Sequence, residues 1–227
     1  MAERNTKIVY IRQEDIVSSK KLAKAKVSLI GAGAVGSFAA LAISKMGLGS
    51  LSIFDEDGIT NHNFPNQFYR KQDVNQFKVE SLASILDEFA DTRVKQNICY
   101  YKNQKLEETV IVAPDSMATR KLVWNEFLKQ PQCKNYIEAR MGAEVGMVYT
   151  IREKSKATIK FYESTLKNDS EIKPLPCTAR SIIYNVLGIC AYIGRSYKSI
   201  IMDEKDYPRE IIINLAQITE FPVLVRK

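Results

Sequence analysis

The sequence predicts an α/β fold whose doubly wound, mostly parallel sheet ends in antiparallel strands. Three observations predict it: a buried strand that runs into a glycine-rich turn and then a helix, an alternation of strand and helix patterns as far as Gly142, and a change of pattern beyond that residue. The chain has 227 residues and is 45% apolar, enough to bury one sizeable core without disulfides. We therefore expect a single domain over residues 1–227.

The glycine-rich turn is the most informative of these features. Gly31 permits the tight turn after the strand, Gly33 lets the backbone approach a phosphate without a Cβ in the way, and Gly36 lets the helix pack closely on the strand. Asp55 ends the next apolar strand, 22 residues after Gly33, which is the spacing of a carboxylate that hydrogen-bonds a ribose hydroxyl. The combination predicts a Rossmann-like nucleotide site. The glycines alone are weak evidence, because a turn that binds nothing can have the same pattern.

Hydrophobic periodicity places the remaining elements. Strands are expected at 27–30, 50–54, 93–99, 109–113 and 135–139, and helices at 34–46, 74–89, 116–129 and 179–194. A polar loop over 55–72 follows the second strand. Beyond Gly142 the alternating stretches GMVYTIR and TIKFYE predict an antiparallel hairpin, followed by a proline-containing loop at 164–176 and by one or two late strands in the tail INLAQITEFPVLV. The helix 179–194 is apolar nearly all round and is expected to be buried.

The net charge of +7 is concentrated at the beginning of the chain, where residues 1–26 carry seven Lys and Arg against three acids. This segment is expected to be helical. Its lysines are interpreted as a solvated helix face, with attraction to an acidic partner or to phosphates as the alternative. No helix-turn-helix, aromatic RNA-binding signature or arginine stripe accompanies the charge, so nucleic acid is not an expected partner.

Composition also bears on the compartment. No stretch reaches the roughly 18 apolar residues that a membrane span requires, and the N-terminus lacks the apolar stretch of a secretory signal. We therefore expect a cytoplasmic protein with no membrane partner. The chain has no CxxC pair among its four cysteines, so we expect neither structural zinc nor a disulfide framework.

Two features exceed what a plain nucleotide-binding fold requires: a segment of about 25 residues before the glycine turn, and a loop after Asp55 that is dense in Asn, Gln and Lys. The residues that combine with the turn into one pattern are Tyr10-Ile11-Arg12-Gln13, Asp55-Glu56-Asp57-Gly58-Ile59, Asn63-Phe64-Pro65-Asn66-Gln67, Lys78, and Asp115 with Arg120. In this pattern the chain resembles the ThiF/MoeB superfamily of ubiquitin-activating-type adenylating enzymes over about residues 9–200.

The resemblance implies an ATP-dependent adenylyltransferase that activates the C-terminal carboxylate of a small ubiquitin-like or sulfur-carrier protein, or of a peptide. It implies that Lys78 reaches the phosphates and that Asp115 holds Mg²⁺. It further implies that Arg12 contacts phosphates bound by the neighbouring subunit of a homodimer, and that residues 164–178 form a loop crossing over the substrate tail. The nucleotide-binding residues implied are Gly31, Gly33, Gly36, Asp55, Asp57, Asn63, Gln67 and Lys78.

The chain departs from the family pattern in three places. Asn66 stands where the family has an arginine, with Arg70 or Lys71 as candidate substitutes for that phosphate contact. Ser116 follows Asp115 where the family has Asn, and the paired CxxC zinc motifs of many members are absent. A non-catalytic member that binds nucleotide or a partner, for example as half of a heterodimer, is therefore the second hypothesis.

Each of these site residues also has a structural alternative. Lys78 could be a surface lysine at the start of a helix, and Asp115 could cap the helix 116–129. Asn63 and Gln67 could be turn formers. An NAD-dependent oxidoreductase is a third hypothesis for the glycine turn. It is disfavoured because hydride transfer would need neither the lysine nor the second aspartate, and because no separate substrate domain is recognisable.

Cys177 lies in the sequence PCTARS, at the end of the predicted crossover loop. Several members of the family carry a cysteine there that forms a thioester or persulfide. The N-terminus of the helix 179–194 and the neighbouring Arg180 would favour the thiolate. The alternative is a small hydrophobic residue that seals the loop.

We predict that Cys177→Ala leaves pyrophosphate exchange intact and stops transfer of the activated carboxylate, or of its sulfur, to an acceptor, because the nucleotide site does not need the thiol. A structural cysteine would instead lose about 1 kcal/mol of stability and affect both half-reactions modestly. Mass-resolved iodoacetamide labelling checks the thiolate argument, since Cys177 should react faster than Cys99, Cys133 or Cys190. Equal rates would contradict it.

Overall fold

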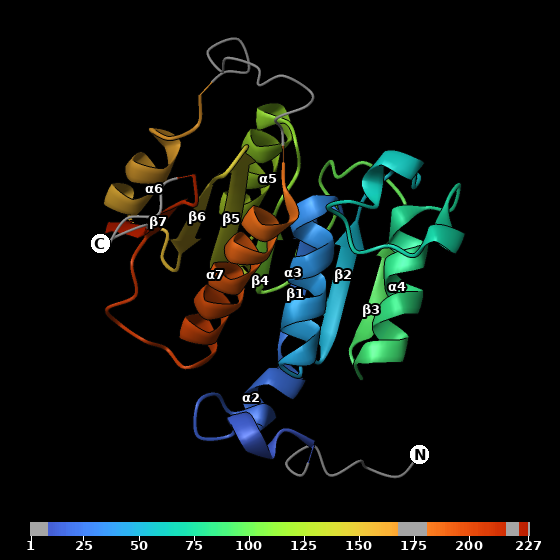
Figure 1. The fold of residues 1–227 in the computed structure, drawn as a ribbon. Helices are drawn as coiled ribbons and strands as arrows, with labels where there is room; N and C mark the ends of the chain where they lie inside the picture. Colours follow the sequence, from blue (N-terminus) through green and yellow to red (C-terminus); the bar gives the residue numbers. More distant parts are fainter. Residues whose placement is uncertain (1–8, 168–180, 217–222, 227) are drawn as a thin grey trace.

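A computed structural model describes residues 9–167, 181–216 and 223–226. Figure 1 shows a central sheet with helices on both faces. The strands are β1 Lys26–Ile30, β2 Ser50–Phe54, β3 Arg93–Asn97, β4 Thr109–Val112, β5 Asn135–Gly142, β6 Val145–Ile151, β7 Glu210–Asn214 and β8 Val223–Arg226. The helices are α2 Ser19–Lys24, α3 Ala34–Lys45, α4 Lys78–Phe89, α5 Met117–Lys129, α6 Lys156–Glu163 and α7 Ile183–Ile201, with 3-10 helices at Ile11–Gln13, Asn61–Asn63 and Lys71–Asp73.

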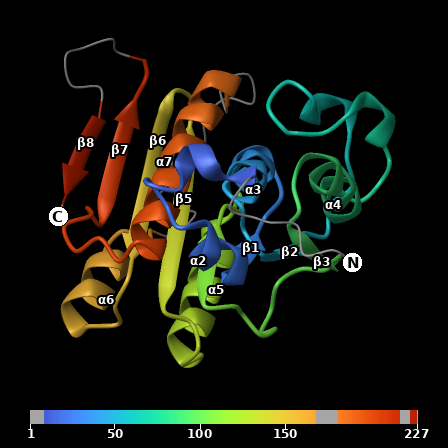
Figure 2. The ribbon, with the colours of Figure 1, turned by 90° about the horizontal axis from the view of Figure 1, so that it is seen from below.

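The described strands form one sheet in the order β3-β2-β1-β4-β5-β6-β7-β8. Strands β1 to β5 pair in parallel, and β5 to β8 pair antiparallel. Helices α3, α4 and α7 cover one face, whereas α5 and α6 cover the other, as the view from below in Figure 2 shows. The predicted fold class, a Rossmann-like parallel core with antiparallel C-terminal strands, is confirmed.

Each face of the sheet has its own core. On the first, small residues of α3 such as Ala39 allow α7 to pack closely beside it over the sheet. On the second, the Trp124 ring lies against the rings of Phe127, Tyr136 and Tyr162. Helix α7 is less buried than predicted, since Leu187 on its outer side is 49% exposed.

One predicted strand is wrong. The stretch TIKFYE lies in helix α6, where the Ser155 hydroxyl caps the first turn by accepting the Thr158 N–H. Thr158 and Tyr162, one helical turn apart, are its buried residues, a pattern that a six-residue stretch does not distinguish from alternation. The hairpin forms instead between β5 and β6, whose connection includes Ala143 at a φ of 51°.

Other elements differ from prediction mainly at their ends. The helix expected from residue 74 begins at Lys78, because Asn75 has a φ of 69° that no α-helix accommodates. Helix α7 continues to Ile201, and residues before 181 that were predicted to begin it lie outside the described part of the chain. The predicted crossover loop also lies outside it from residue 168 onward. None of the described helices has the length and apolar character needed to cross a membrane.

The turn between β1 and α3 is tightly packed. Gly31 has a φ of 90°, and a Cβ there would meet the Ala113 carbonyl oxygen at 2.8 Å. A Cβ on Gly36 would lie 1.9 Å from the Gly31 carbonyl oxygen. Helix α3 therefore reaches the end of β1 only because residue 36 has no side chain.

We predict that Gly36→Ala lowers the free energy of unfolding by about 2 kcal/mol or more, because the added methyl group overlaps main-chain atoms. Gly58→Ala is the matched control, since its Cβ would meet only the Gln76 carbonyl oxygen at 3.7 Å. Urea denaturation of both variants and the wild type measures the difference. A Gly36→Ala midpoint equal to that of the control would contradict the prediction.

Candidate active site

A cavity of about 850 Å³ lies at the carboxyl ends of the parallel strands. It lies where the chain passes from the β2 side of β1 to the β4 side, the position at which open α/β sheets bind ligands. Its described walls are the glycine turn, the end of β2, part of the following loop, the start of α4, the segment after β3, the β4–α5 turn and the end of β5.

The structure brings most of the predicted site residues to this cavity. The predicted residues that line it are Gly31, Gly33, Asp55, Asp57, Gln67, Lys78 and Asp115. Gly36 packs behind the turn, and Asn63 and Arg12 lie elsewhere. Cys177 lies outside the described residues, so its predicted role stays a prediction.

The glycine turn presents an open surface to the cavity. A Cβ on Gly33 would meet no described atom within 4 Å. Gly33 is also the N-cap of α3, and it supplies no side chain to the N–H groups of the first helical turn, where Ala34 and Val35 line the cavity. Unpaired N–H groups at a helix N-terminus attract an anion, so the turn can receive a phosphate.

Asp55 holds the glycine turn from the end of β2. Its Oδ2 accepts the Ala32 N–H at 2.7 Å, and its Oδ1 accepts the Asp57 N–H at 2.9 Å. The Tyr69 hydroxyl donates to the Ala32 carbonyl oxygen at 2.6 Å, so both backbone polar groups of Ala32 are fixed. Burial raises the pKa of Asp55 above its usual range, although Lys78 and these N–H groups oppose the rise. Each carboxylate oxygen keeps a lone pair for a ribose hydroxyl.

Lys78 is buried at the wall of the cavity, with 7% of its surface exposed. Its Nζ lies 2.6 Å from Asp57 Oδ2 and 3.8 Å from Asp55 Oδ1. A buried ammonium group requires an anionic partner, and both of these carboxylates line the same cavity. The alternative of a surface lysine is therefore excluded, and the position suits a second anion such as a phosphate.

Asp115 follows β4 and opens onto the cavity. Its side chain is exposed and makes no hydrogen bond or ion pair with another described residue. Ser116, not Asp115, caps α5, because the Ser116 hydroxyl accepts the Thr119 N–H at 3.1 Å. Among the described residues no group of three or more His, Cys, Asp or Glu could hold a metal by itself. The free carboxylate fits Mg²⁺, which binds through one or two carboxylates completed by phosphate oxygens.

The asparagine-rich loop after β2 contributes two residues to the cavity. Gln67 lines it, and its Oε1 is buried with no hydrogen-bond partner among the described residues, which is typical of a site that a ligand completes. Asn66 also lines it, but its amide donates to the Ser181 hydroxyl. Asn63 instead forms the turn, since its Oδ1 accepts both the N–H and the hydroxyl of Thr60.

The two candidate substitutes for the missing arginine lie away from the cavity. Arg70 donates through Nε to Asp73 at 3.1 Å and pairs with Glu88 at 2.5 Å. Lys71 is exposed on the surface. Within the described chain, Lys78 and Arg120 are the basic side chains that line the cavity.

Sequence reasoning missed the wall that follows β3. Cys99, Tyr100 and Tyr101 line the cavity there beside Phe54, and the Tyr100 hydroxyl hydrogen-bonds to the Thr119 hydroxyl. Aromatic side chains at the mouth of a nucleotide pocket suit the flat face of a base. The sequence signal that could have indicated this wall is the pair Tyr100-Tyr101, which follows β3, the strand that pairs with β2.

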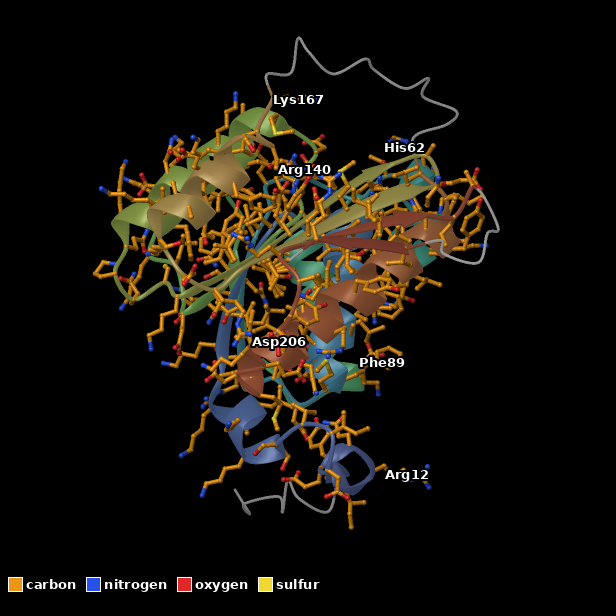
Figure 3. All side chains as sticks on the ribbon, turned by 90° about the vertical axis from the view of Figure 1, so that its left-hand side faces the viewer. Arg12, His62, Phe89, Arg140, Lys167 and Asp206 are labelled. Carbon is orange, nitrogen blue, oxygen red and sulfur yellow. The ribbon has the colours of Figure 1, made fainter. Side chains whose placement is uncertain are left out.

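Arg12 lies at the opposite end of the molecule from the loop that contains His62, as Figure 3 shows. Its two motif neighbours anchor the segment: Gln13 Nε2 donates to the Met46 carbonyl oxygen at 2.6 Å, and the Tyr10 ring covers Gly47. Arg12 itself is exposed. Arg12 does not line the cavity of its own chain, so it could contact a ligand only in the corresponding cavity of a second chain.

The sheet order, the glycine turn and the cavity at the switch point define an α/β protein with a Rossmann-like fold of the nucleotide-binding type. A family model described as the ThiF family matches residues 3–215, and the chain belongs to this family.

Among curated proteins, the chain is similar to adenylyltransferase and sulfurtransferase uba4. It is 31% identical to the Neosartorya fischeri protein over 114 residues, which are 50% of this chain and 23% of that protein. It is 39% identical to the Aspergillus fumigatus protein over 69 residues, which are 30% of this chain and 14% of that protein. The chain thus covers less than a quarter of the length of these relatives.

Solved structures share the fold at low sequence identity. Escherichia coli MccB solved with ATP has a TM-score of 0.70 and 16% identity, covering 100% of this chain and 73% of that one. MccB with succinimide has a TM-score of 0.71 and 16% identity, covering 92% of this chain and 65% of that one. PaaA has a TM-score of 0.71 and 16% identity, covering 92% and 74%. This likeness establishes the architecture.

We predict that Gly33→Ala weakens ATP binding about tenfold or more, because its methyl group would occupy space in the cavity next to the free N–H groups. Stability should change by about 0.5 kcal/mol or less, since the methyl group touches no described atom. Titration calorimetry with ATP measures the first effect and urea denaturation the second. Wild-type affinity in a folded variant would show that no phosphate lies against this turn.

Proposed function

We propose that this protein is an ATP-dependent adenylyltransferase that activates the C-terminal carboxylate of a small ubiquitin-like or sulfur-carrier protein, or of a peptide. The observation that carries the proposal is the meeting of the open glycine turn, buried Lys78 and partner-free Asp115 in one cavity. Two relatives agree with it: the uba4 proteins are named as adenylyltransferases, and MccB has been solved with ATP and with MccA.

In adenylation, an oxygen of the substrate carboxylate forms a bond to the α-phosphorus of ATP. The bond from that phosphorus to the bridging oxygen breaks, and pyrophosphate leaves with the bonding electrons. The products are an acyl adenylate and pyrophosphate. The protein need not take a proton in this step, so catalysis depends on positioning the two reactants and on neutralising phosphate charge.

The residues of the cavity suit these tasks. The first turn of α3 would bind one phosphate group through its N–H groups. The Lys78 ammonium would neutralise a second phosphate group, either by breaking its ion pair with Asp57 or by contacting both at once. Asp55 and Gln67 would hydrogen-bond the ribose. A bound Mg²⁺ would withdraw negative charge from the phosphates, with Asp115 as its protein ligand. Met141 and Gly142, at the end of β5, line the cavity and would face the substrate tail.

A non-catalytic member that binds nucleotide or a partner is the second candidate. Asn66, which donates to Ser181, offers no positive charge where family members have an arginine. A cavity with fewer cations would stabilise the pentavalent phosphorus less strongly. An NAD-dependent oxidoreductase is the least favoured reading, since hydride transfer would use neither the buried lysine nor Asp115.

We predict that the purified protein exchanges labelled pyrophosphate into ATP when offered the correct carboxylate, and that Asp115→Asn abolishes the exchange by removing the charged metal ligand. The variant should fold normally, because Asp115 is exposed and Ser116 supplies the helix cap. Calorimetry should show binding of ATP with Mg²⁺ and none of NAD. Near-normal exchange by Asp115→Asn, or tighter binding of NAD, would contradict the assignment.

We propose further that the protein acts as a homodimer in the cytoplasm, with Arg12 completing the site of the neighbouring subunit. Arg12 is exposed and is not among the residues that line its own cavity, which supports the first part. The free thiols of Cys99, Cys133 and Cys190 are in keeping with the second.

We predict that mixing inactive Arg12→Ala protein with inactive Asp115→Asn protein restores part of the activity, because one hybrid site then contains both wild-type residues. Arg12→Ala should itself keep wild-type stability, since its side chain is exposed. Pyrophosphate exchange in the mixture is the measurement, with subunit exchange checked by mass spectrometry of labelled chains. Exchange without rescue would mean that Arg12 serves no neighbouring site.

A further inference from the structure

Arg120 lines the cavity but is not free to contact a ligand. It is 7% exposed, and its Nη1 donates to the Ala139 carbonyl oxygen at 2.8 Å and pairs with Glu138 Oε1. Its Nη2 donates to the Pro114 carbonyl oxygen at 2.5 Å. The guanidinium thus joins the end of β5 to the turn that precedes Asp115.

Glu138, on β5, is the centre of the polar cluster that holds Arg120. It is fully buried and also accepts from Arg140 Nε at 2.7 Å and from the Tyr162 hydroxyl at 2.5 Å. Burial alone would raise the pKa of Glu138, but Arg120, Arg140 and these hydrogen bonds hold it below its usual range. The carboxylate is therefore ionised and is shared by two arginines.

The two oxygens of this carboxylate have different neighbours. Oε1 is the partner of Arg120 and also accepts from Arg140 Nε, whereas Oε2 accepts from Tyr162 and from Arg140 Nη2. Loss of the charge at Glu138 would weaken the hold on Arg120, and the Pro114 contact depends on where Arg120 lies. Loss of the Tyr162 hydroxyl would leave the Arg120 pair unchanged.

We propose that Glu138 is a positioning residue that, through Arg120, sets the place of the Ala113–Asp115 turn and hence of the Asp115 carboxylate in the cavity. Three hydrogen-bonded contacts and one peptide bond carry the argument: Glu138 to Arg120, Arg120 to Ala139 and to Pro114, and the peptide bond that joins Pro114 to Asp115. The inference rests on the proposed function, because it assigns Asp115 the role of metal ligand.

A buried ion pair is weak evidence for a stabilising role, since apolar side chains of similar volume often stabilise as much. Glu138 lies next to a well-packed aromatic cluster that could accept such a residue. A charged network that reaches from this cluster to the cavity wall is explained better by the geometry that it imposes on the turn.

The test compares ATP affinity with and without Mg²⁺ in four proteins: wild type, Glu138→Gln, Tyr162→Phe and Asp115→Asn. We expect Glu138→Gln to reduce the enhancement by Mg²⁺ about tenfold or more, the usual effect of losing a residue that orients a metal ligand. ATP affinity without Mg²⁺ should stay at the wild-type value. Tyr162→Phe should lower stability through a lost buried hydrogen bond and keep the full Mg²⁺ enhancement.

Hydrogen exchange supplies a readout that a purely structural role would not give. The amides of the Ala113–Asp115 turn should exchange faster in Glu138→Gln and at the wild-type rate in Tyr162→Phe. If Glu138→Gln does not fold, Arg120→Lys replaces it, because a lysine keeps the charge and cannot reach Glu138 and Pro114 together.

Three outcomes are decisive. Loss of the Mg²⁺ enhancement in Glu138→Gln or Arg120→Lys, with Tyr162→Phe normal, supports the inference. An unchanged enhancement in a folded Glu138→Gln protein, with the effect of Asp115→Asn intact, overturns it and leaves the proposed function standing. Absence of Mg²⁺-dependent ATP binding in the wild type overturns the proposed function and this inference together.

Discussion

The close approach of helix α3 to the end of β1 is the constraint on which the site depends. A Cβ added to Gly31 or to Gly36 would lie less than 3 Å from a main-chain carbonyl oxygen, so neither position has room for a side chain. Because the helix begins at the very edge of the sheet, its first N–H groups open onto the same volume as the ends of β2 and β4. Asp55 then fixes the turn by accepting the Ala32 N–H, so a carboxylate placed for a nucleotide also shapes the loop that binds it.

Charge is distributed around the cavity in a way that favours a nucleotide with a metal ion. Lys78 is paired with Asp57, and Arg120 is paired with Glu138, so both cations are held in place before any ligand binds. Asp115 alone among the predicted carboxylates has no partner in the described chain. A lysine already held at the cavity wall and one partner-free carboxylate suit a reaction in which phosphate charge must be neutralised.

In the N-terminal motif, residues 10–13, two side chains attach the segment to the rest of the chain and a third is exposed. Tyr10 and Gln13 hold the segment to the end of α3, through the face of Gly47 and the Met46 carbonyl oxygen. Arg12 is exposed between them, at the end of the molecule opposite the loop that contains His62 (Figure 3). The backbone at Arg12 is held by its neighbours while its side chain is exposed to solvent. This arrangement suits contact with a second chain, as the homodimer proposal requires.

The sequence by itself determined the parallel core, the glycine turn and the place of Asp55, because each follows from a local pattern or a fixed spacing along the chain. The family resemblance singled out Lys78 and Asp115, and the structure places both at the cavity. Only the tertiary structure decided that TIKFYE is a helix, that Asn63 forms a turn while Gln67 faces the cavity, and that Ser116 supplies the cap. The burial of Glu138 between two arginines could not be predicted from the sequence either, since the partners of its carboxylate come from α5, β5 and α6. Periodicity reports which face of an element is apolar, whereas contacts between distant segments depend on strand order and helix placement, which no short stretch of sequence contains.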